Sequence, residues 1–418
     1  MKKLFEIMTT LFIFAAPIAI YAQAGSIAGS LQIGVHLDAS YQWSGSSKRD
    51  SRLNYKYTEI RWPGYDSVNI GDVALELNGK VGERISFKVL EALVMDGTSV
   101  IVPDFTLVGA GSTLLIRHKP AVGAKTLEAY VDIKIMEPLK FRVGKQLTPT
   151  LLANTGIHQA NVFRSANAPL IANRAVGTNQ LRVGSNIPVK ADAPDFVTGA
   201  AIIGSFSGAE ISYTWFDGWL KQGSFVNADD FSINVGDVDY DFNKTKGANI
   251  ALGYSGHVGP GKIAARAFYF DELSETAAST PKLRTQGWGL GASYTHAKFF
   301  IAAEYANDTL SLDKNLIPSP GKNDNNWWGF YLTLAGKFSG IEPLYRLDYV
   351  NYTNWNDNAV ADITSYDTET WHTIGVNYWF NDNALVGLDY VIKAPEMGKL
   401  YKYPNINELI IYLEVNTL

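Results

Sequence analysis

Seven basic side chains without acidic neighbours are the residues of this sequence best suited to act on a solute. From Pro138 to Ala191 there are seven lysines and arginines and no aspartate or glutamate, although the whole chain has a net charge of −5. Cations gathered in this way attract anions, and around a pore they filter them. We therefore predict a constriction that includes Arg164, Arg174, Arg182 and Lys190. If the segment instead lay outside the fold, the same charges would neutralise surface phosphates.

Residue patterns for catalysis or metal binding do not rise above background. The six histidines are scattered without metal-ligand spacing, and the chain has no cysteine. The glycines of 287–291 alternate within a predicted strand, which is not the context of a dinucleotide-binding loop. Glu342 and Asp348 share one face of a predicted strand, where a hydrated wall is favoured over a hydrolytic pair. We predict no enzyme activity, no cofactor, no metal and no nucleic-acid partner.

Period-two alternation of apolar and polar residues runs through most of the chain after its first thirty residues. Leu127, Ala129 and Val131 share one face of a predicted strand, while Glu128 and Tyr130 share the other. This period is typical of a strand with two different environments on its faces. The predicted strands lie near 30–43, 67–79, 83–95, 125–135, 139–147, 195–206, 209–218, 246–256, 261–272, 285–295, 298–308, 326–337, 341–353, 369–380, 384–394 and 405–417.

The connections between these strands alternate in length. Seven are tight turns, such as Ser207-Gly208 and Ser339-Gly340, and eight are longer loops. A closed antiparallel barrel in a membrane has this arrangement, and aromatic residues near the strand ends fit its two girdles. We predict an all-β, 16-stranded transmembrane barrel with both termini on the short-turn side. A further hairpin within 98–118 would raise the number to eighteen.

The third long loop, 148–194, is too long for a structureless connection without a role. It is rich in small and apolar residues, so we expect it to fold into the barrel. The pleat would line the interior with charges of both signs. The predicted basic residues of this wall are Lys134, Lys140, Arg142, Arg266 and Arg346, and the acidic ones are Glu128, Asp132, Glu304, Asp348 and Asp389.

The first 24 residues have the features of a secretory signal peptide. Lys2 and Lys3 precede an apolar run, and Ala22-Gln23-Ala24 fits a cleavage site. The mature barrel domain is then expected to span 25–418. Export of a barrel predicts the outer membrane of a Gram-negative-type bacterium, with its lipid and lipopolysaccharide as partners.

Short motifs resemble those of the phosphate-selective porin O and P family. They are Leu139-Lys-Phe-Arg-Val-Gly-Lys-Gln146 before the long loop, Asn173-Arg-Ala-Val-Gly177 within it, and the late hairpin from Thr373 to Tyr390. The resemblance implies a 16-stranded and usually trimeric channel. By position, the basic constriction of that family would correspond to Arg164, Arg174 and Arg182.

These observations predict passive diffusion of small hydrophilic solutes, with a mild anion preference set by the basic loop. The alternatives are an adhesion or scaffold barrel, a lipase-like barrel enzyme and a channel for apolar substrates.

Overall fold

The structure is a computed structural model of the full 418-residue chain. It describes residues 31–44, 47–48, 61–62, 65–96, 121–152, 164–167, 169–171, 180–182, 188–190, 196–217, 246–274, 283–312, 324–353, 368–397, 401–402 and 406–417. The predicted signal peptide, the possible hairpin at 98–118 and Arg174 lie outside the described residues. No helix in the described ranges is long and apolar enough to cross a membrane.

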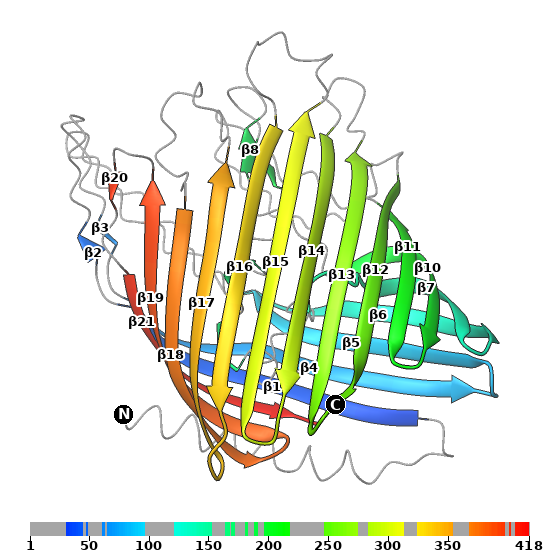
Figure 1. The fold of residues 1–418 in the computed structure, drawn as a ribbon, viewed down its shortest axis with the longest axis horizontal. Helices are drawn as coiled ribbons and strands as arrows, with labels where there is room; N and C mark the ends of the chain where they lie inside the picture. Colours follow the sequence, from blue (N-terminus) through cyan, green and yellow to red (C-terminus); the bar gives the residue numbers. More distant parts are fainter. Residues whose placement is uncertain are drawn as a thin grey trace.

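Sixteen antiparallel strands form one closed ring (Figure 1). Each strand pairs with its neighbours in chain order, and β1 closes the ring by pairing with β21. The predicted number and order of strands are confirmed. The ring consists of β1 (Leu31–Ser44), β4 (Tyr65–Val81), β5 (Ile85–Asp96), β6 (Ala121–Met136), β7 (Leu139–Leu147), β10 (Phe196–Phe206), β11 (Ala209–Asp217), β12 (Lys246–Val258), β13 (Gly261–Ser274), β14 (Leu283–Thr295), β15 (Phe299–Leu312), β16 (Asp324–Gly336), β17 (Ile341–Thr353), β18 (Thr368–Asn381), β19 (Ala384–Met397) and β21 (Ile406–Asn416).

Five short strands lie outside the ring or extend it locally. They were not predicted, because two or three residues are too few for a period-two pattern. In the third long loop, β8 (Gln180–Arg182) pairs with β9 (Pro188–Lys190). In the first, β2 (Ser47–Lys48) pairs with β3 (Arg61–Trp62), and β20 (Tyr401–Lys402) pairs with the end of β19.

Seven tight turns join strands at one end of the barrel, as predicted. Ser207 and Gly208 have φ values of 48° and 83°, and Ser339 and Gly340 have φ values of 47° and 86°. Two successive positive φ values are the mark of a type I′ turn, whose twist matches that of the strands it joins. Figure 1 shows the turns from β12 to β19 at its lower edge.

The two faces of each strand have different environments, as in β19. Leu385 and Asp389 point inward and are 1% and 0% exposed, while Leu388 and Tyr390 point outward and are 41% and 38% exposed. The buried apolar core lies inside the ring, where Leu151, Leu170 and Ile171 of the third loop pack against inward-facing side chains of β11–β19. The third loop therefore folds into the barrel.

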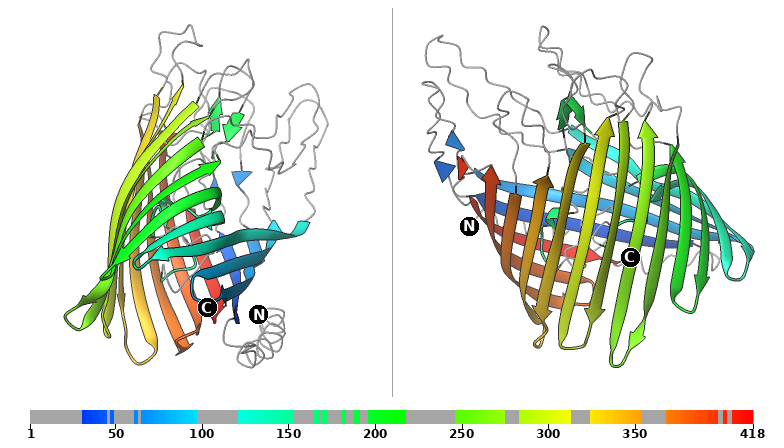
Figure 2. Two further views of the ribbon diagram at one scale, coloured as in Figure 1. Left: turned by 90° about the vertical axis from the view of Figure 1, so that its right-hand side faces the viewer. Right: turned by 45° about the horizontal axis from the view of Figure 1, so that its top comes forward.

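The strands differ in slant around the ring. Strands β12–β17 rise steeply, whereas β1, β4 and β5 cross behind them at a shallow slope (Figure 1). Seen from the side, the β4–β7 part of the ring forms a lower wall than β13–β16 (Figure 2).

Candidate functional site

The candidate site is the region where the third loop meets the inner wall of β13–β19, which we call the docking wall. The loop is held mainly through its own backbone. At three points the wall supplies a carboxylate that accepts from a loop N–H, and beside it a donor that reaches a loop carbonyl.

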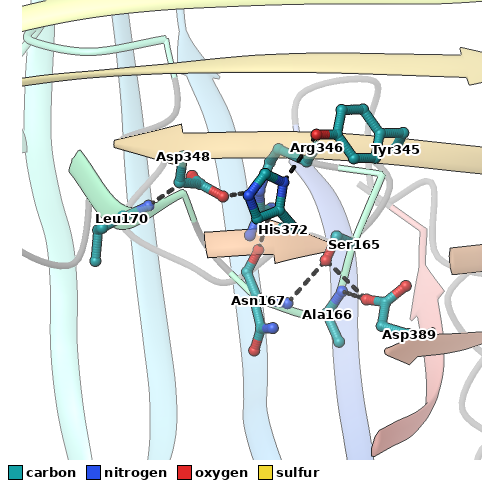
Figure 3. A network of polar contacts seen from close by, with 9 residues as sticks. All are labelled: Ser165, Ala166, Asn167, Leu170, Tyr345, Arg346, Asp348, His372 and Asp389. Carbon is teal, nitrogen blue, oxygen red and sulfur yellow. Dashed lines mark hydrogen bonds and ion pairs between the residues drawn. The ribbon is translucent and has the colours of Figure 1, made fainter. Parts of the chain in front are cut away.

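The first point joins the loop to β18 and β19. Asp389 Oδ2 accepts hydrogen bonds from Ser165 Oγ at 2.7 Å and from the Ala166 N–H at 2.8 Å (Figure 3). The Asn377 side-chain amide donates to the Arg164 carbonyl at 3.1 Å. Asp389 fits here because its partner across the strands is Gly375, where a Cβ would lie 2.1 Å from Asp389 Oδ1.

The second point lies on β17. Asp348 Oδ1 accepts from the Leu170 N–H at 2.8 Å, and Asp348 Oδ2 accepts from Arg346 Nε at 2.8 Å (Figure 3). Arg346 also donates to the Asn167 carbonyl at 2.5 Å. The side chains of Arg346 and Asp348 are both 0% exposed. A buried charge needs an opposite charge beside it, and each of these two residues supplies it for the other.

The third point holds the beginning of the loop. The Leu152 N–H donates to Glu304 of β15 at 2.5 Å, and Arg266 of β13 donates to the Leu151 carbonyl at 3.4 Å. The three points lie on β13, β15, β17, β18 and β19. The loop residues 151–152, 164–167 and 169–171 are thus fixed along one side of the interior.

Arg164 also contacts the docking wall through its charged side chain. Its guanidinium carbon lies 4.6 Å from the centre of the Phe300 ring and 5.6 Å from that of Trp379. Glu342 lies 3.5 Å from Arg164 Nη1, and the two side chains are 1% and 9% exposed. Arg164 has a φ of 61°, a conformation that a non-glycine residue adopts only when its surroundings hold it. Burial lowers the pKa of Arg164, and the nearby Glu342 carboxylate raises it.

The wall of β4–β7 lies eight places around the ring from β14–β17, so it faces the docking wall; we call it the facing wall. Lys88 on β5 bridges Glu76 of β4 at 3.0 Å and Glu128 of β6 at 2.7 Å. The side chains of Lys88 and Glu76 are partly exposed, at 23% and 12%, whereas that of Glu128 is buried, at 8%.

A second group lies nearer the short turns of this wall. Asp132 accepts from Arg142 Nε at 2.6 Å and Nη2 at 2.9 Å, and from Lys140 at 3.1 Å. Arg142 also stacks 3.7 Å above the Tyr130 ring. Opposite charges alternate across the facing wall, and such a surface keeps water in contact with it.

The sequence-derived site residues fall into three groups. Nine of the predicted wall residues are on the interior face of their strands and take part in the contacts above: Lys140, Arg142, Arg266, Arg346, Glu128, Asp132, Glu304, Asp348 and Asp389. Lys134, the tenth, pairs with Glu137 at the turn end of β6. Of the four constriction residues, Arg164 is buried against the docking wall, and Arg182 and Lys190 lie on β8 and β9. Their role as an anion filter stays a prediction.

Several residues of the docking contacts were not anticipated. Asn377, Phe300 and Trp379 of the wall contact the loop, and Ser165 of the loop contacts Asp389 of the wall. None of these four residues stands out by charge or spacing in the sequence. Glu342 and Asp348 were noticed as a same-face pair, and each holds a different part of the loop. One local signal could have predicted a docking residue: Asp389 is a polar residue at an inward position, and its partner across the neighbouring strand is Gly375.

Comparison with known proteins agrees with this geometry. The model of the family described as Gram-negative porin matches residues 9–391. The chain belongs to the Gram-negative porin family. It is therefore an outer-membrane barrel protein, and the interior loop is in the position to narrow the pore of this porin. No curated protein matches the chain in sequence.

Three solved structures illustrate the shared fold. The porin is similar to the outer-membrane channel DcaP of Acinetobacter baumannii, with a TM-score of 0.55 and 11% identity, covering 94% of this chain and 98% of that one. An anion-selective porin from Comamonas acidovorans has a TM-score of 0.55 and 9% identity, covering 93% and 99%. The trimer form of OmpT from Vibrio cholerae has a TM-score of 0.50 and 11% identity, covering 92% and 98%.

Proposed function

We propose that this porin is a non-enzymatic channel for passive diffusion of small hydrophilic solutes, and that their path runs between the docked third loop and the facing wall. The observation that carries the proposal is the attachment of the loop to one side of the interior. Three buried carboxylates fix the loop there, and the charged side chains of Lys88, Arg142 and Lys140 remain partly exposed opposite. A polar, hydrated wall across from a fixed loop suits water-soluble substrates.

We also propose a mild anion preference. On the facing wall, Lys88, Lys140 and Arg142 balance Glu76, Glu128 and Asp132, so these six side chains together have no net formal charge. Carboxylates of the docking wall are covered by the loop that they hold. Of the cations in 138–191, Lys140 and Arg142 pair with Asp132 and Arg164 pairs with Glu342, so the proposed preference rests on the other basic residues of the third loop, Arg174, Arg182 and Lys190. One of the structural relatives is described as anion-selective, which supports the same direction for this chain.

Selectivity for phosphate among anions is the more specific prediction, and it follows from the sequence resemblance to the porin O and P family. Its test is competition, because a phosphate-binding constriction would lower chloride conductance when phosphate is added. An anion filter without phosphate selectivity would leave that conductance unchanged.

Planar-bilayer recording tests the proposal directly. Refolded protein should produce discrete conductance steps, and their absence would remove the basis for a channel. In a KCl gradient, the reversal potential should indicate a modest excess of chloride permeability. If alanine at Arg164, Arg174 and Arg182 together leaves the reversal potential unchanged, the basic loop is not the filter.

For assembly we propose a homotrimer embedded in outer-membrane lipid and lipopolysaccharide. One structural relative is described as a trimer, and the resemblance noted in the sequence implies the same state. Sedimentation in detergent, with the bound detergent subtracted, measures the number of chains.

A further inference from the structure

The six charged side chains of the facing wall fall into two groups with opposite net charge. In the first group, which we call the acidic centre, Lys88 bridges the carboxylates of Glu76 and Glu128. Glu76 also accepts from the Asn78 side-chain amide, and Glu128 accepts from the Leu147 N–H at 3.3 Å. These further donors are neutral. One ammonium between two carboxylates therefore leaves the acidic centre with a formal charge of −1.

The second group, which we call the basic centre, has the reverse composition. Asp132 accepts two hydrogen bonds from the Arg142 guanidinium and one from the Lys140 ammonium. Two cations share one carboxylate, so the basic centre has a formal charge of +1. Lys140 has the most exposed side chain of the six, at 33%, and is the cation most accessible to a solute.

Both centres face the interior of the barrel. Leu75, Val131 and Val143 point outward and are 43%, 36% and 45% exposed. Each is followed or preceded in its strand by a charged residue of the two centres, and successive strand residues point to opposite faces. The charged side chains of β4, β6 and β7 therefore lie together on the inner surface.

Tyr130 lies between the two centres. It is the direct partner of Lys88 across β5 and β6, and its ring is covered by the Arg142 guanidinium. Among these six described charged residues, every ion pair lies within one centre or the other. The opposite charges of the two centres are thus kept apart along the wall.

The spacing of the centres suits a short peptide. Glu128 and Asp132 are four residues apart on β6, which corresponds to about 13 Å along the strand. An extended peptide spans about 3.5 Å per residue, so three or four residues bring its terminal ammonium and carboxylate to a similar separation. A single amino acid is too short to reach both centres.

We propose that the facing wall binds zwitterionic peptides of three or four residues. The terminal ammonium pairs with the acidic centre at Glu76, and the terminal carboxylate pairs with the basic centre at Lys140. A solute with a single charge is attracted by one centre and repelled by the other, whereas the zwitterion is attracted by both. An ion pair at a partly exposed site changes affinity by up to about fivefold. The inference rests on the proposed function, because it names a substrate class for the path along this wall.

Saturation-transfer NMR of refolded protein in detergent tests the site without relying on permeation. The probes are triglycine, N-acetyltriglycine, which lacks the ammonium, and triglycinamide, which lacks the carboxylate. Triglycine should bind several-fold more tightly than either. Equal binding of N-acetyltriglycine would mean a site for anions alone and would overturn the inference. Absence of triglycine binding would overturn it as well.

Two substitutions remove the net charge of one centre each. Glu76→Gln brings the acidic centre to zero and Lys140→Gln brings the basic centre to zero, so each should weaken triglycine binding about two- to fivefold. Lys298→Gln is the matched control, because Lys298 is exposed in the turn between β14 and β15. It should bind triglycine as the wild type does. If the double variant of Glu76 and Lys140 also binds like wild type, the two centres are not the site.

Swelling of vesicles that contain the same proteins tests the channel separately. Triglycine should enter wild-type vesicles several-fold faster than its uncharged counterpart N-acetyltriglycinamide, and the double variant should admit both at the same rate. Equal rates in the wild type would reject the peptide site and retain the channel. Triglycine binding without entry of either compound would reject the proposed function and retain the site.

Discussion

Asp389 is the residue whose replacement should most clearly release the third loop. In Asp389→Ala, Ser165 Oγ and the Ala166 N–H both lose their acceptor. Asp389 is 0% exposed, so water does not replace it without rearrangement of the loop. Hydrogen bonds to a charged acceptor contribute about 1.5–3 kcal/mol each. The two bonds together are therefore worth about 3 kcal/mol to docking at the lower limit.

A loss of about 3 kcal/mol raises the equilibrium constant for undocking by about 150-fold, since each 1.36 kcal/mol is tenfold. In single-channel recordings the wild type should show one steady level. Asp389→Ala should show transitions to a higher level, and vesicles containing it should admit larger sugars in a swelling assay. Asp389→Asn keeps an acceptor oxygen without the charge and should give an intermediate effect.

Asp382 provides a matched control, because it is an exposed aspartate in the turn between β18 and β19. Asp382→Ala should leave the conductance as in wild type. If Asp389→Ala also conducts like wild type, with equal sugar permeation, then the loop is not held at this point by hydrogen bonding and the reasoning fails.

Three further changes have expected outcomes. Gly375→Ala places a methyl group 2.1 Å from Asp389 Oδ1, so it should displace that carboxylate and reproduce the unsteady conductance, without any change to the loop sequence. Arg164→Ala leaves Glu342 buried without its cation, so it should destabilise docking of the loop by about 3 kcal/mol. The measurement is amide hydrogen exchange near residue 166, which should become faster in Arg164→Ala and recover in part in Arg164→Lys. Lys88→Met removes the cation between two carboxylates of the facing wall and should move the reversal potential in a KCl gradient toward cations; an unchanged potential would place the solute path elsewhere.

The barrel itself could be predicted from the sequence because a closed sheet repeats one simple rule. Each strand alternates inward and outward residues, and each short turn limits where the next strand can begin. Strands β7 and β17 begin and end where the pattern placed them, at 139–147 and 341–353. The infolding of the third loop was also accessible, because its length and its small apolar residues needed a packing partner.

The attachment of the loop could not be predicted in the same way. The wall carboxylates bind backbone N–H groups of residues 152, 166 and 170, and every residue except proline has such a group. The sequence of the loop therefore contains little information on where it docks. Arg164 shows the reverse problem, since its charge suggested a filter and its actual neighbours are two aromatic rings and a glutamate.

This mode of attachment separates two properties of the pore. The position of the loop depends on Glu304, Asp348 and Asp389, which lie on three different strands of a rigid barrel and bind backbone atoms. Among the loop residues that the structure describes, Arg164 and Ser165 supply the side chains of these polar contacts. We therefore expect that charges elsewhere in the loop can change without moving it. Pore width would then be set by the docking wall and ion preference by the loop. Variants that alter ion preference at constant conductance are expected in the loop, and variants that alter conductance are expected in the wall.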